Sequence, residues 1–169
     1  MTRFAADVID TVLGISDGSP LHQLRARRPE ARARTQSSYA VLFNPRDPGG
    51  LSPPERFAVA LRVAELHDAS SLTGHYRARL ADEAGGGALA AAIDYDAPSN
   101  GLTARAAAML RHAELVTTNP SGASPLDLEA LEAQGLTAEE IVTLSQIIAF
   151  VAYQVRVAAS LALIAETTP

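Results

Sequence analysis

Hydrophobic residues recur along the chain at the three- and four-residue spacing of helices, and almost no stretch alternates as a half-buried strand does. Capping residues, prolines and glycines bound these stretches. Helices are therefore predicted over about 4–13, 19–28, 29–43, 53–66, 70–82, 88–93, 103–117, 124–134 and 138–165. Loops are predicted over 44–51, 94–101 and 118–123. The pattern predicts an all-α fold in one compact domain.

Two of the predicted helices are strongly apolar. The helix at 53–66 is apolar nearly all round, as buried helices are. The helix at 138–165 is the longest, but polar side chains interrupt it, among them Arg156. Because a membrane span needs ~20 mostly apolar residues and a central arginine costs ~2.5 kcal/mol or more, we expect a buried helix and no membrane association. It carries more apolar surface than a small monomer core needs, which predicts a homo-oligomer.

Composition narrows the chemistry. The 169 residues carry a net charge of −5, and all 14 basic residues are arginine, so the charge does not favour nucleic-acid binding. The absence of cysteine excludes disulfides, thiolate nucleophiles and cysteine-ligated metals. Asp7 and Asp10 interrupt any apolar segment near the start, so no signal peptide is predicted and a cytoplasmic location is expected.

The buried helix at 53–66 bears candidate acid–base groups. Glu55 and Arg62 are seven residues apart and share a helix face, and an apolar setting with a nearby arginine perturbs the pKa of a carboxylate. A structural interpretation also stands. Ser52–Glu55 is a capping box, like Thr137–Glu140 further along, and Arg62 and Glu65 can form a surface pair.

The segment from His67 to Tyr76 is the densest in polar groups. A helix beginning there would offer free amides and positive potential to an anionic ligand, and His75 titrates near neutral pH. Alternatively, Asp68 or Ser70 caps the helix and the histidines lie at its edge. The spacing of His67, Asp68 and His75 fits no familiar metal site, so no metal is predicted.

Two stretches resemble the alkylhydroperoxidase D-like / carboxymuconolactone decarboxylase superfamily. Residues 51–67, LSPPERFAVALRVAELH, resemble the glutamate-bearing helix of that family, and residues 127–163 resemble its second half. In the peroxidase members the first stretch leads into Cys-x-x-Cys-x-x-x-His. Aligned on His75, the cysteine positions hold Asp68 and Ser71; moved by one residue, they hold Ala69 and Leu72, with Tyr76 in place of the histidine. The resemblance therefore implies a cysteine-free branch, in which thiol peroxidase chemistry is not available.

The resemblance implies an all-α, single-domain, alkylhydroperoxidase D-like helical bundle, with residues 1–50 as an N-terminal helical extension of a core at 51–169. It implies cofactor-free acid–base chemistry, as in the decarboxylase branch, on a small organic acid or lactone. The residues that it places in the site are Glu55, His75, Asp68 and Ser71 as catalytic groups, and Arg62, His67 and Tyr76 as substrate-binding groups. The alternative is a non-catalytic binding protein on the same scaffold, working beside a cysteine-containing relative. A dimer, trimer or hexamer is expected in either case.

Overall fold

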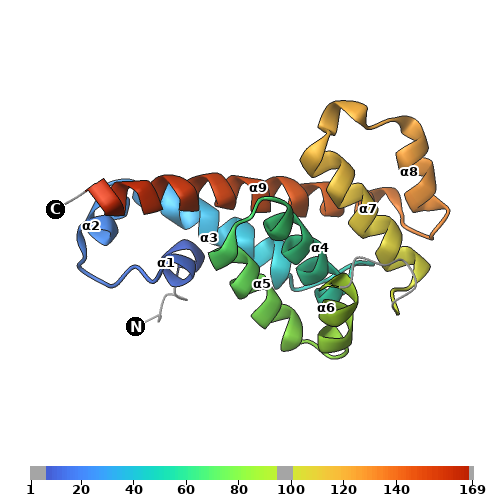
Figure 1. Cartoon of the computed structure of the whole chain (residues 1–169), viewed down its shortest axis with the longest axis horizontal. Helices are drawn as coiled ribbons and strands as arrows, with labels where there is room; N and C mark the ends of the chain where they lie inside the picture. The colour runs from blue at the N-terminus through green and yellow to red at the C-terminus, as the bar shows by residue number, and fades with distance from the viewer. Residues whose placement is uncertain (1–6, 95–100, 168–169) are drawn as a thin grey trace.

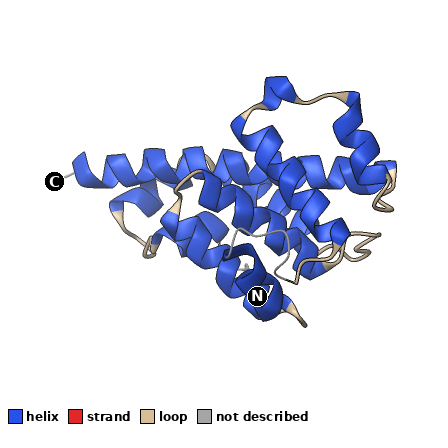
Figure 2. Cartoon of the chain, turned by 45° about the vertical axis from the view of Figure 1, so that its right-hand side comes forward, coloured by secondary structure: helices blue, strands red, loops and turns tan. Residues whose placement is uncertain are grey.

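A computed structural model describes residues 7–94 and 101–167. Within these residues the chain forms nine α-helices, one short 3-10 helix and no strand (Figure 2), which confirms the all-α prediction. The elements are α1 (Val8–Leu13), α2 (Pro20–Ala26), α3 (Pro29–Phe43), α4 (Pro53–Leu66), α5 (Ser70–Ala81), α6 (Gly86–Asp94), α7 (Ala104–Thr118), the 3-10 helix η1 (Pro120–Gly122), α8 (Pro125–Glu132) and α9 (Ala138–Thr167).

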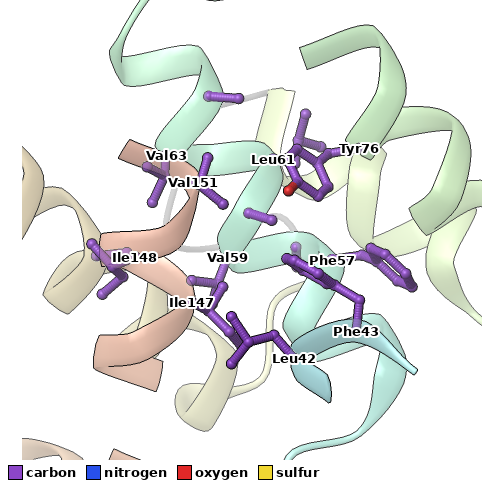
Figure 3. Close-up of a cluster of buried hydrophobic side chains, with 14 of the residues drawn as sticks. Leu42, Phe43, Phe57, Val59, Leu61, Val63, Tyr76, Ile147, Ile148 and Val151 are labelled. Atoms are coloured by element: carbon purple, nitrogen blue, oxygen red, sulfur yellow. The ribbon is translucent and has the colours of Figure 1, made fainter. Parts of the chain in front are cut away.

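Helix α4 forms the centre of the molecule, as its apolar sequence predicted. It packs against α5, α7 and α9. Its buried side chains meet the end of α3 on one side and the middle of α9 on the other (Figure 3). Phe43 of α3 stacks on Phe57 of α4, with ring centroids 5.2 Å apart. Since Val8, Ile9 and Phe43 belong to the same buried cluster, the N-terminal extension supplies part of the core.

Helix α9 runs along the long axis of the molecule, with α1 and α2 at its C-terminal end and α7 and α8 near its beginning (Figure 1). By length and composition it is the one described helix that could cross a membrane, but a buried core helix passes the same test. One third (33%) of its most apolar 18-residue window is buried within this chain. Much of its apolar surface is therefore exposed, including Val142, Tyr153, Leu163 and Ile164.

A single arginine, Arg105 of α7, connects the first turns of α4 and α9. Both helices begin with the predicted capping boxes, closed by Glu55 and Glu140. The Arg105 guanidinium donates to Glu55 at 2.9 Å and to Glu140 at 2.7 Å. It also donates to the carbonyl oxygens of Gly50 and Gly135, both at 3.1 Å. Three segments distant in sequence are thus held together by one side chain.

The structure departs from the sequence expectations in small ways. The predicted loop at 118–123 contains η1 (Pro120–Gly122). Helix α6 begins at Gly86 instead of residue 88. Of the three consecutive glycines at 85–87, only Gly85 takes a left-handed conformation, with φ +77°. Gly86 continues into the helix close to α5, where an added Cβ would lie 1.7 Å from the Leu80 carbonyl oxygen. The predicted start of the first helix at residue 4 and most of the 94–101 loop lie outside the described residues.

Candidate functional site

The turn between α4 and α5 is built by three residues, His67, Asp68 and Ala69. Asp68 adopts a left-handed backbone conformation with φ 53°, which reverses the chain between the two helices. The N-cap of α5 is Ala69, and no side chain caps the helix. The predicted capping role of Asp68 or Ser70 was therefore wrong. As a result, the first turn of α5 keeps amide groups that no side chain satisfies.

A cavity of about 240 Å³ lies beside this turn. We call it the α4–α5 cavity. The residues His67 to Leu72 form one wall, and small or apolar side chains of α1 and α9 form the other: Leu13, Val155, Ala158, Ala159 and Ala162. Its polar groups all come from the turn and the beginning of α5. The cavity is therefore apolar over most of its lining, with one polar edge at a helix N-terminus.

Three of the seven predicted site residues line this cavity: His67, Asp68 and Ser71. Asp68 and Ser71 are exposed, whereas His67 is partly buried. The Nε2 atom of His67 is buried and has no hydrogen-bond partner among the residues that the structure describes. A buried imidazole nitrogen without a partner is costly for stability. Because this atom is closed to solvent, a ligand in the cavity would reach it only after the imidazole turns.

His75 lies one helical turn after Ser71 in α5 and is paired with Tyr39 of α3. The His75 Nε2 atom and the Tyr39 hydroxyl are 2.9 Å apart. Burial lowers the pKa of His75, and the nearby Arg79 lowers this pKa further. Burial raises the pKa of Tyr39. The pair is therefore neutral near pH 7, and His75 can act as a proton acceptor but holds no charge for an anion.

Tyr76 is enclosed in the core instead of lining the cavity. Its side chain is fully buried beside Leu61 (Figure 3). The phenolic hydroxyl donates to Oε1 of the buried Gln154 in α9, and burial raises the pKa of Tyr76 far above its usual value. The Nε2 atom of Gln154 has no partner in the described part of the chain. This contact ties α5 to α9.

Glu55 and Arg62 have partners of their own. Glu55 accepts from the backbone N–H and hydroxyl of Ser52, at 2.8 and 2.7 Å, and from Arg105. Arg62 donates to Glu114 of α7 at 3.0 Å. Neither residue lines the α4–α5 cavity. The structure thus assigns Glu55 to the capping box that the sequence offered as its structural interpretation, in contact with α7.

No group of three or more histidine, aspartate or glutamate side chains in the described ranges could hold a metal ion. Sequence reasoning missed Tyr39, the partner of His75, and the alanines of α9 that line the cavity. The sequence predicted the helices that carry them. It held no information on which face of the 29–43 helix meets α5, since such a contact is set by packing of distant segments.

Comparisons with known proteins show the fold and little more. No protein-family model matches this chain, and no curated protein matches it. Among solved structures it is similar to an uncharacterized peroxidase-related protein from Silicibacter sp. TM1040, with 24% identity and a TM-score of 0.64. The match covers 79% of this chain and 69% of that protein. At this level of identity the likeness establishes a shared fold: this chain has the helical fold of a peroxidase-related protein.

Proposed function

We propose that this chain is a cysteine-free protein of the alkylhydroperoxidase D-like / carboxymuconolactone decarboxylase kind that binds a small neutral carbonyl compound, such as a lactone, in the α4–α5 cavity. The observation that carries the proposal is the cavity itself, which meets the uncapped N-terminus of α5 at the His67–Leu72 turn. The fold shared with a peroxidase-related protein agrees with the family assignment.

The lining of the cavity selects for a compact, weakly polar ligand. Leu13, Val155 and Ala158 offer apolar contacts for a ligand's carbon skeleton. Amides at the first turn of α5 can donate to a carbonyl oxygen, helped by the positive end of the helix dipole. The volume of about 240 Å³ lies below the ~300–1,000 Å³ of pockets for drug-sized ligands. The ligand is therefore small.

Charge favours a neutral ligand over a carboxylate. Asp68 stands in the lining with an ionisable carboxyl group, and its charge repels a second anion. His67 is the one other titratable residue among those lining the cavity. Between the two ligand classes that the family resemblance implies, a lactone suits this cavity better than an organic acid.

The test is the binding of γ-butyrolactone, measured by ligand-observed NMR. Ala162→Leu places a larger side chain in the cavity and should abolish the binding signal. Ala130→Leu makes the same change at an exposed position of α8 and should leave it intact. Lactone binding that survives Ala162→Leu, or no binding at millimolar concentration, would overturn the proposal.

A second candidate function is cofactor-free acid–base catalysis on the bound lactone. The observation in its favour is that His67 lines the cavity and its Nε2 atom has no partner among the described residues, whereas the carboxylate of Glu55 is occupied by Ser52 and Arg105 and does not line the cavity. Hydrolysis of the lactone, in which water adds to the carbonyl carbon and the ring C–O bond breaks to give the hydroxy acid, should then be faster with protein than without. His67→Gln should lower the rate about 100-fold or more while lactone still binds. A rate unchanged by His67→Gln would rule out His67 as the proton carrier.

We also propose that the protein works as a homo-oligomer through the exposed apolar face of α9, with a second copy of this chain as its partner. The support is the contrast between the mean hydropathy of this helix, 2.0 over its most apolar window, and the one third of that window buried in a single chain. Leu163→Glu should dissociate the oligomer in size-exclusion chromatography with light scattering. Leu126→Glu, at a leucine of α8 that is at least as exposed, should not. A wild-type monomer would contradict this part.

A further inference from the structure

Arginine is concentrated at one end of this acidic protein. Five of the 14 arginines fall within residues 25–34, although the chain as a whole carries a net charge of −5. Three of them, Arg25, Arg28 and Arg32, line a cavity of about 190 Å³ between α2, the beginning of α3 and the last part of α9. We call it the arginine pocket. It uses other residues of α9 than the α4–α5 cavity does.

Two buried aspartates of α1 hold two of these arginines in place. Asp7 and Asp10 are each 8% exposed. Nη1 of Arg25 donates to Asp7 at 2.8 Å and also to Asp10, and Arg32 donates to Asp10 and lies 3.4 Å from Asp7. The Arg25 side chain is itself only 10% exposed. This network fixes the arginines before any ligand arrives.

With Arg28 included, the pocket holds three guanidinium groups against the two carboxylates of Asp7 and Asp10, so it carries one net positive charge. Arg28 is exposed at the N-cap of α3, and its side chain has no partner in the described ranges. Nε and Nη2 of Arg25 likewise have no protein acceptor among the described residues, because only Nη1 engages the aspartates. Free guanidinium N–H groups thus remain on both residues.

The other polar groups of the pocket are already committed. Thr35 Oγ1 donates to the Ala31 carbonyl oxygen at 2.9 Å, so the Tyr153 hydroxyl, 2.8 Å away, must donate to Thr35. Neither hydroxyl proton is left for a ligand. Ala31, Val157 and Leu161 complete the lining with apolar atoms. The free donors are therefore guanidinium groups, set beside an apolar floor.

From this arrangement we propose that the arginine pocket binds a small carboxylate with a short apolar tail. The carboxylate bridges Arg25 and Arg28, whose planar groups match its two oxygens. The tail lies on Val157 and Leu161. This ligand differs in charge from the neutral compound proposed for the α4–α5 cavity, and the inference does not rest on that proposal.

The test uses hexanoate as the probe, with calorimetric titration of the full-length protein. Arg28→Ala removes a guanidinium that makes no hydrogen bond or ion pair with the described residues, so the fold should be preserved. Affinity should fall about tenfold or more, the worth of one charge-assisted pair. Arg34→Ala removes the same charge from an exposed position of α3 that does not line the pocket. It should change affinity less than about twofold, since only screened long-range attraction is lost.

Two further measurements ask whether binding needs both the volume of the pocket and the charge of the ligand. Ala31→Leu fills the pocket with all arginines present and should abolish hexanoate binding, whereas Ala33→Leu, outside the lining, should not. Hexanol, which has the tail without the charge, should bind at least about tenfold more weakly than hexanoate. Equal losses in Arg28→Ala and Arg34→Ala, binding unaffected by Ala31→Leu, equal affinity for hexanol, or no hexanoate binding at millimolar concentration would each overturn the proposal.

Discussion

Replacing Arg105 by methionine should be among the most destabilising changes in this protein. The side chain makes four hydrogen bonds, two to carboxylates at 2.7 and 2.9 Å and two to carbonyl oxygens at 3.1 Å. Its partners are well shielded from water, because Glu55 is 18% and Glu140 10% exposed. Methionine keeps much of the apolar stem and removes all of the donors. Two partly buried glutamates then remain without a cation.

The expected magnitude follows from these contacts. Hydrogen bonds to charged groups contribute about 1.5–3 kcal/mol each, and breaking one partner out of a buried ion pair costs about 3–5 kcal/mol. Arg105 is itself 25% exposed, and both glutamates keep their capping-box bonds, so solvent and backbone amides compensate part of the loss. We therefore expect a loss of about 2–4 kcal/mol, a large share of the ~5–15 kcal/mol typical of a domain.

Urea unfolding followed by circular dichroism measures this loss. Arg111→Met, at an exposed arginine six residues further along α7, serves as the control and should stay within about 0.5 kcal/mol of the wild type. A loss below about 1 kcal/mol for Arg105→Met, or one equal to that of the control, would refute the reasoning.

The same pair of proteins gives an acid test. Hydrogen bonds from the Thr137 backbone, together with Arg105, hold the pKa of Glu140 below its usual range. A depressed carboxyl pKa stabilises the fold above the unfolded-state value, ~4.3 for glutamate, and this stability is lost as pH falls through the folded-state pKa. The difference between wild type and Arg105→Met should therefore shrink below about pH 4.

Three further predictions concern the other polar contacts. Tyr76→Phe should cost about 1–3 kcal/mol in urea unfolding, because it leaves Oε1 of the buried Gln154 unpaired; a change under 0.5 kcal/mol would argue against that hydrogen bond. The titration midpoint of His75 in an NMR pH series should lie below ~6.5, and a midpoint above 6.5 would contradict its burial. Because the unfolded chain then binds more protons than the folded chain, this residue should make stability increase with pH up to about neutrality. Asp10→Asn should speed hydrogen exchange in α1 and α2 with little effect on α4, since Asp10 ties α1 to Arg25 and Arg32. If the substitution changed the exchange rates of all three helices equally, the network would not be what holds α1 and α2.

Local rules predicted most of the fold. The capping boxes at Ser52 and Thr137 indicated helix starts that the structure confirms, since a cap is decided by residues three positions apart. The burial of the 53–66 helix followed from its apolar circumference. These features depend on short stretches of sequence, which is why they could be predicted without knowledge of the rest of the chain.

Such local rules could not predict the contacts between segments that are distant in the sequence. The pairs Tyr39–His75, Arg105–Glu140 and Tyr76–Gln154 span 36, 35 and 78 positions. Nothing in the spacing of these residues indicates which helix faces meet, because packing angles and side-chain volumes decide it. The sequence accordingly gathered Glu55, His67 and His75 into one candidate site by proximity along two consecutive helices. In the structure Glu55 is bound to Arg105, His67 lines the α4–α5 cavity, and His75 is paired with Tyr39.

The absence of cysteine and the pairing of Glu55 fit together. When the chain is aligned on His75, Asp68 and Ser71 stand where the resembled peroxidases carry thiols, and neither side chain can exchange electrons. In this chain both carboxylate oxygens of Glu55 accept hydrogen bonds, one from Ser52 and one from Arg105, which supports the first turn of α4. A carboxylate engaged in this way would have to give up a partner before it could reach a substrate, and it does not line the cavity. If the proposed acid–base catalysis takes place, its proton carrier is therefore His67 or His75, and the two are separable because only His67 lines the cavity.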